Sequence, residues 1–95
     1  MAFSINFSEE KNQLLKATRG INFEDAIDAI EKNTVLADIA HPSKQHKHQR
    51  MYVLEINSYA YVVPYVVNKQ KKEIFLKTMY ASRFFTAKYL KRGQS

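Results

Sequence analysis

Two extended segments joined by a two-residue turn constrain the fold of this chain most. Residues 50–56 and 59–67 are rich in Val, Ile, Leu and Tyr, and the polar pair Asn57-Ser58 stands between them. A connection of two residues joins strands that run antiparallel and pair with each other. A third strand is predicted over 73–80, after the basic turn 68–72, because Ile, Phe, Leu and Thr dominate it. These strands predict a contiguous antiparallel meander.

Two helices are predicted before this meander. Residues 3–7 alternate apolar and polar side chains and are typical of a short strand. Ser8 is a suitable N-cap for a helix over 9–18, and Gly20 is a suitable stop. Asn22 caps a second helix, which ends near residue 33. Its apolar residues recur with helical spacing and predict one buried stripe: Phe23, Ala26, Ile27 and Ile30.

The rest of the chain completes an α+β domain. Residues 35–39 are expected to be extended, residues 41–49 form a polar loop, and Ser82 caps a final helix. We therefore predict a single domain over 1–95. Its twisted antiparallel sheet would carry two N-terminal helices and one C-terminal helix, packed on one face of the sheet.

The charge distribution points to a polyanionic partner. Residues 1–40 hold 4 Lys and Arg against 7 Asp and Glu, a net charge of −3. Residues 41–95 hold 11 Lys and Arg against 2 acidic residues, a net charge of +9, together with all 6 tyrosines and all 3 histidines. Cations attract phosphate, and aromatic rings stack on unpaired bases, so RNA heads the list of partners. The alternative is an ordinary solvated surface with strand tyrosines.

The composition and the motifs of the sequence argue against several classes of protein. The chain has no cysteine, which excludes disulfides, thiolate nucleophiles and Cys-bound zinc. The N-terminal residues do not resemble a signal peptide, and the longest apolar run, 59–67, is too short to cross a bilayer and contains Pro64. These features favour a cytoplasmic protein without membrane association. No phosphate-binding glycine loop, hydrolase motif or helix-turn-helix is visible.

The order of several short motifs resembles BrnT-type toxins. The motifs are Phe-Ser-Glu-Glu-Lys-Asn at 7–12, Arg-Gly-Ile-Asn-Phe-Glu-Asp-Ala at 19–26, and Lys-Thr-Met-Tyr-Ala-Ser-Arg at 77–83. The resemblance covers nearly the whole chain. It departs from the family at Arg19, often His there, at Ser82-Arg83, often Arg-Arg, and at Phe7-Ser8, often Trp-Asp. The final helix also lacks an acidic residue over 84–90.

This resemblance implies a fold like that of RelE-type ribonucleases. It implies the toxin of a type II toxin–antitoxin pair, which cleaves RNA without a metal or cofactor and inhibits translation. The partner would be a cognate antitoxin, usually a ribbon-helix-helix protein, so DNA would be reached only through the antitoxin. The alternative function is a non-catalytic module of the same fold that binds RNA or a protein.

Candidate catalytic residues are those that suit metal-independent RNA cleavage. Arg83 is expected to clamp the phosphate, because its planar guanidinium is always charged and it lies at the start of the last helix. Lys77 in the last strand and Lys11 in the first helix are further candidates. His48 is the candidate proton carrier. For each, the alternative is a solvated or snorkelling surface side chain.

Further residues are expected to bind RNA or to pack in the core. The spacing of His41, His46 and His48 does not match a known metal site, so no metal is predicted. Tyr61 and Tyr65 share one face of the middle strand and either stack a base or pack in the core. The complete set of predicted RNA-binding residues is Arg19, Arg50, Tyr61, Tyr65 and Lys88.

Overall fold

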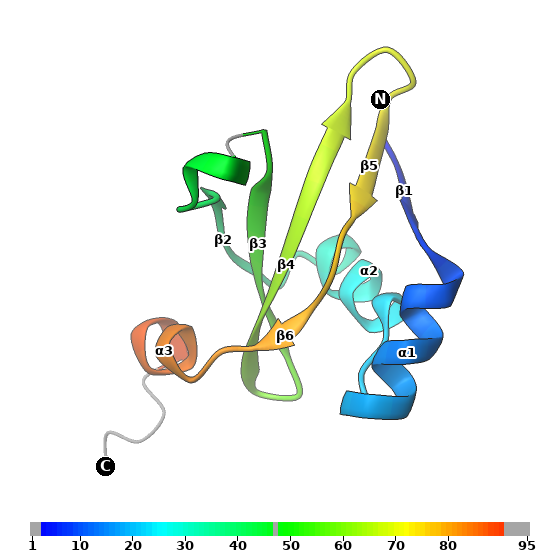
Figure 1. The fold of residues 1–95 in the computed structure, drawn as a ribbon. Helices are drawn as coiled ribbons and strands as arrows, with labels where there is room; N and C mark the ends of the chain where they lie inside the picture. The colour runs from blue at the N-terminus through cyan, green and yellow to red at the C-terminus, as the bar shows by residue number, and fades with distance from the viewer. Residues whose placement is uncertain (1–2, 47, 91–95) are drawn as a thin grey trace.

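The computed structural model describes residues 3–46 and 48–90, and the side chain of His46 lies outside the described part. Two short helical turns of other types, η1 (Lys44–His46, 3-10) and η2 (Thr86–Leu90, π), accompany the main elements. The main elements, in chain order (Figure 1), are β1 (Ser4–Phe7), α1 (Glu9–Arg19), α2 (Phe23–Glu31), β2 (Val35–Ala40), β3 (Arg50–Ile56), β4 (Tyr59–Asn68), β5 (Glu73–Leu76), β6 (Tyr80–Ala81) and α3 (Arg83–Phe85).

The strands form one mixed sheet in the order β1-β5-β4-β3-β2, with β6 paired to β4. The predicted hairpin is confirmed: Ile56 pairs with Tyr59, and Asn57 and Ser58 have φ of 55° and 63°. The α+β class is confirmed, and the antiparallel sheet gains one parallel pair, β1 with β5. α1 and α2 carry the chain from β1 at one edge of the sheet to β2 at the other edge (Figure 1). The antiparallel strands β2 to β5 then bring the chain back to lie beside β1.

Local capping signals place both N-terminal helices. The Ser8 hydroxyl accepts a hydrogen bond from the backbone N–H of Lys11 at 3.2 Å. The Asn22 side chain accepts one from the N–H of Asp25 at 2.8 Å. Gly20 ends α1 with a backbone φ of 67°, a left-handed conformation that residues with a Cβ atom rarely adopt. The predicted caps are therefore confirmed.

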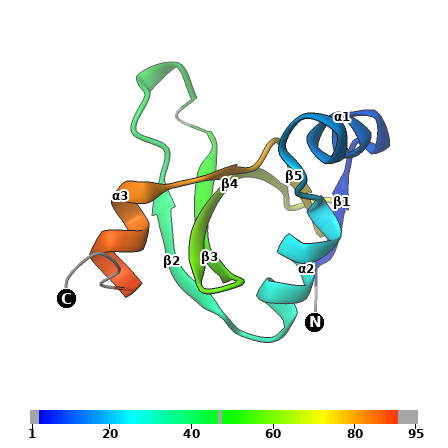
Figure 2. The same cartoon turned by 90° about the horizontal axis from the view of Figure 1, so that it is seen from below.

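The helices lie on both sides of the sheet, as Figure 2 shows. α1 and α2 cover the inner face, where Leu15 and Phe23 pack with Leu54 and Leu76 in the main core. The prediction that all helices share one face is wrong for the last one. α3 and η2 lie against β4, because Ser82 N–H donates to Ala60 O and the Thr86 hydroxyl accepts from Ala60 N–H.

The predicted strand 73–80 is interrupted. It consists of β5 (73–76) and β6 (80–81), separated by residues 77–79. Lys77 N–H still donates to Pro64 O at 2.8 Å, and Tyr80 pairs with Val62. Thr78 and Met79 thus face the single residue Val63 across the ladder. This arrangement is a β-bulge, and it is the irregularity that shapes the candidate site.

Candidate nucleic-acid interface

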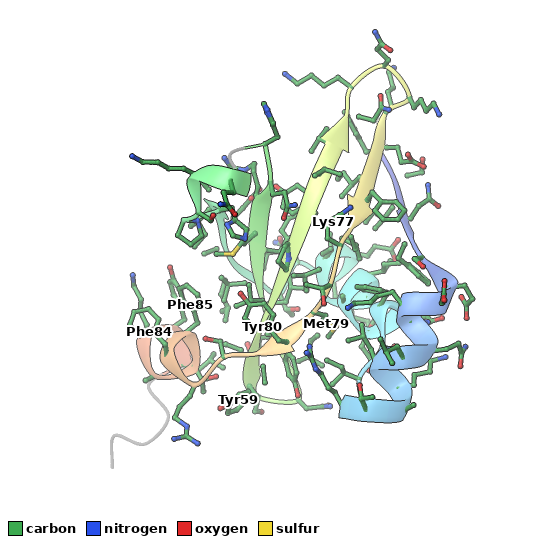
Figure 3. All side chains as sticks on the ribbon, viewed as in Figure 1. Tyr59, Lys77, Met79, Tyr80, Phe84 and Phe85 are labelled. Atoms are coloured by element: carbon green, nitrogen blue, oxygen red, sulfur yellow. The ribbon has the colours of Figure 1, made fainter. Side chains whose placement is uncertain are left out.

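The outer face of the sheet, meaning the side away from α1 and α2, carries exposed cationic and aromatic side chains near β4. Lys77 lies beside Pro64, and Tyr80 lies opposite Val62, so both side chains project on this face. Lys77 Nζ is 5.5 Å from the centre of the Phe75 ring, and Tyr80 is 39% exposed. Figure 3 shows Lys77, Tyr80 and the rings of the C-terminal helix along this part of the sheet.

The C-terminal helix continues this row of cationic and aromatic groups. Arg83 is exposed and directly follows Ser82, whose hydroxyl accepts from Phe85 N–H at 3.1 Å. Phe84 is 68% exposed. Lys88 Nζ is 5.5 Å from the ring centre of Tyr89, which itself stacks on Phe85. Exposed rings and cations together are the groups that bind unpaired bases and phosphates.

Two hydrogen bonds to Ala60 fix the helix to the sheet, and one of them uses a buried hydroxyl. Thr86 is 2% exposed, and its Oγ1 donates to Ser82 O at 2.7 Å while accepting from Ala60 N–H at 2.9 Å. A hydroxyl can do both at once, and here it occupies the place of a strand partner for Ala60. Arg83 and Lys88 are therefore held next to β4.

The structure does not gather all predicted site residues on the outer face. Lys11 is half-buried on α1, across the sheet from α3 (Figure 2). Arg19 ends α1, and its Nη1 donates to the backbone oxygen of Met79 at 2.8 Å. His48 is exposed in the loop between β2 and β3. Tyr61 is half-buried against the core of the inner face.

Tyr65 is buried and is not available to stack a base. It is 3% exposed, its ring stacks on Tyr52 with centres 4.1 Å apart, and its hydroxyl donates to Asp38 Oδ1 at 2.6 Å. The prediction of Tyr65 as an RNA contact is corrected for this reason. Burial and the hydrogen bond to Asp38 raise the pKa of Tyr65 above its ordinary value, so the phenol stays neutral.

Arg50 belongs to the same polar cluster. Its Nε donates to Asp38 Oδ1 at 3.1 Å and its Nη2 to Asp38 O at 2.8 Å. The hydrogen bond to Asp38 raises the pKa of the guanidinium. The carboxylate offsets the charge of Arg50, so this side chain attracts an anion less than a cation without an acidic partner would. Among the described residues, no acceptor is hydrogen-bonded to the guanidinium of Arg83, and no carboxylate forms an ion pair with it.

Replacing Tyr65 by phenylalanine is expected to reduce the loss of stability in alkaline solution. Because the folded pKa is raised, the neutral phenol favours the fold. This contribution is fully present below the unfolded pKa of about 10 and is lost as the pH rises above it. Urea unfolding at pH 8 to 11 should show a shallower decline for Tyr65→Phe than for the wild type. The exposed control Tyr80→Phe should decline like the wild type, and equal slopes for all three proteins would contradict this account.

Asn12 is a structural residue that the sequence did not single out. It is 0% exposed, its Nδ2 donates to Glu24 Oε1 at 3.0 Å, and its Oδ1 accepts from Phe23 N–H at 2.7 Å. The hydrogen bond from Asn12 lowers the pKa of Glu24. Asn12 therefore fastens α1 to the first turn of α2. The sequence pattern gives no signal for this role, because three of its four helical neighbours, Ser8, Glu9 and Lys16, are polar.

Within 3–46 and 48–90, no three His, Asp or Glu side chains are grouped to hold a metal ion. No helix in this part of the chain is long and apolar enough to span a membrane.

The comparisons with known proteins give one similar solved structure. No family model and no curated protein matches the chain. The chain is similar to the structure titled "Crystal structure of metal-bound toxin from Helicobacter pylori", with 17% identity and a TM-score of 0.48. The similarity covers 83% of this chain and 93% of the other.

Proposed function

We propose that this protein is the endoribonuclease toxin of a type II toxin–antitoxin pair, which inhibits translation by cutting RNA. The observation that carries the proposal is the outer-face row of exposed cations and rings, defined as Lys77, Tyr80, Arg83, Phe84 and Lys88. These side chains occupy one stretch of the chain beside β4. The motif order of the sequence, which resembles BrnT-type toxins, agrees with this location.

The outer-face row suits cleavage by the RNA's own 2′-hydroxyl. This oxygen attacks the adjacent phosphorus, and the products are a 2′,3′-cyclic phosphate and a 5′-hydroxyl. Arg83 would hold the scissile phosphate and offset the negative charge that builds on its oxygens. Lys77, level with Pro64 further along β4, would bind a neighbouring phosphate of the same strand. Tyr80 and Phe84 would stack neighbouring bases. His48 lies in the loop between β2 and β3 and not in this row, so the 2′-hydroxyl proton would pass to water, which would also protonate the leaving 5′-oxygen. No step of this reaction requires a metal ion.

The proposed partner is a small antitoxin, of the ribbon-helix-helix type by resemblance. The simplest way to silence the toxin is to cover the outer-face row, so the covering segment should carry acidic residues. Opposite charges would steer the two proteins together, with faster association at low salt. Contact with DNA would occur through the antitoxin.

The proposal is tested by producing the protein alone in bacteria and by incubating purified protein with RNA. We expect growth arrest, and RNA fragments that end in 2′,3′-cyclic phosphate, with cleavage unaffected by EDTA. The double variant Lys77→Ala/Arg83→Ala is the matched control and should leave RNA intact. RNA that is bound but never cut would instead support the non-catalytic RNA-binding module. If RNA is neither bound nor cut, both RNA functions are refuted and the protein-binding module stands.

A further inference from the structure

Lys77 and Tyr80 face the same side of the sheet because the chain bulges between them. In a regular strand, successive side chains alternate, so residues three apart point to opposite faces. Here Lys77 lies beside Pro64 and Tyr80 lies opposite Val62. The strand β4 thus advances two residues while its neighbour advances three. Without this extra residue, Lys77 and Tyr80 could not both project on the outer face.

Two contacts on the inner side hold the bulge in place. The Met79 side chain is 0% exposed and packs in the main core with Leu15 and Phe23. The backbone oxygen of Met79 accepts a hydrogen bond from Arg19 Nη1 at 2.8 Å. A bulged residue loses its regular ladder partner, and Arg19 supplies the donor in its place. Arg19 is the last residue of α1, so this contact links the helical layer to the bulge.

We propose that Arg19 is a positioning residue for the outer-face row and does not itself bind RNA. Its guanidinium is bound to a backbone oxygen 60 residues away in the chain. Since Met79 O and Tyr80 N belong to one peptide unit, fixing this oxygen fixes the orientation of the peptide that carries Tyr80. The effect on cleavage rests on the proposed function, whereas the effect on the bulge can be measured without any RNA.

The test compares Arg19→Met with Lys16→Met. Arg19→Met keeps an unbranched apolar arm and removes the donor, and Lys16→Met removes the same charge from the same last turn of α1. We expect Arg19→Met to lower kcat between about tenfold and a hundredfold, because a misplacement of about 1 Å can cost the latter factor. KM and its salt dependence should stay near the wild-type values. Lys16→Met should resemble the wild type, and Arg19→Lys should recover part of the lost kcat.

An NMR measurement provides the readout that does not depend on activity. The 15N shift of the Tyr80 amide should change in Arg19→Met, because the hydrogen bond at Met79 O polarises the shared peptide. This shift should not change in Lys16→Met. Thermal melts show whether each variant is folded. If Arg19→Met is unfolded, kcat and the Tyr80 15N shift are compared between Arg19→Lys and the wild type instead.

The outcomes separate the two proposals. If the wild type cuts no RNA, the proposed function is overturned. If the wild type cuts RNA and Arg19→Met cuts equally well, the proposed function stands and the positioning role is overturned. A raised KM with a weaker salt dependence and an unchanged Tyr80 shift would also overturn it, since that pattern marks a direct phosphate contact. A reduced kcat with a displaced Tyr80 shift supports it.

Discussion

Replacing Arg83 by alanine is expected to reduce RNA cleavage about a hundredfold and to abolish growth arrest. Loss of a charged contact to the transition state typically costs about 3 kcal/mol of activation free energy. Arg83 is exposed, so its removal should change the free energy of unfolding by less than about 1 kcal/mol. Activity and melting temperature should therefore separate in this variant, as measured by RNA cleavage rates and thermal melts.

The controls for Arg83→Ala are other exposed cations. Lys77→Ala should lose less activity, and Lys69→Ala, in the turn between β4 and β5, should lose little. His48→Ala should cut RNA near the wild-type rate, because His48 lies in the loop between β2 and β3; a large loss would instead make it the proton carrier. If Arg83→Ala cuts RNA at the wild-type rate, the phosphate is not held at the start of the C-terminal helix.

Replacing Asn12 by alanine is expected to destabilise the fold by about 2 to 4 kcal/mol. The change leaves the buried N–H of Phe23 without its acceptor, removes the donor to Glu24 and opens a small cavity. For a domain of this size, each 1 kcal/mol shifts the melting temperature by roughly 4 to 8 °C. Urea unfolding and calorimetry should both show the loss.

Gln13→Ala is the matched control for Asn12→Ala. Gln13 is the next residue of α1, and its side-chain amide also donates to a glutamate, Glu9, at 2.8 Å. That contact is exposed, so its loss should change the free energy of unfolding by less than about 0.5 kcal/mol. Equal changes in the free energy of unfolding would show that burial does not increase the contribution of the Asn12 hydrogen bonds to stability.

The features that the sequence predicted well are local ones. Ser8, Asn22 and Ser82 cap helices through hydrogen bonds to residues three positions later, so the signal and its effect lie within one turn. The hairpin followed from the Asn57-Ser58 turn, and its register places Arg50 opposite Tyr65. The features that were missed depend on distant partners. The pairing of β1 with β5 and the bulge at Met79 need the packed core to form.

The residues of the candidate site show the same contrast between local features and features that depend on distant partners. Arg83 was proposed for its residue type and its place at the expected start of the last helix, and Lys77 for its place in the expected last strand; the structure leaves both exposed. Tyr65 was misjudged because alternation shows which side chains share a face but not which face the helices cover. The partner of Arg50 was missed because the loop 41–49 is too long to fix which residue of β2 lies next to Arg50, and the observed register pairs Ala40 with Arg50 and Asp38 with Tyr52.

The parallel pairing of β1 with β5 has a consequence for the order of folding. Ser4 pairs with Glu73, and Ala60 bonds to Thr86, so both ends of the chain depend on partners far along the sequence. Contacts between residues so far apart in the sequence form only after long loops have closed. Loop closure costs conformational entropy before the contacts stabilise the fold, which slows folding. During synthesis, at about 5 to 20 residues per second, β1 waits several seconds for β5 to emerge. The outer-face row, over residues 77–88, is thus assembled only after β5 has emerged and can pair with β1.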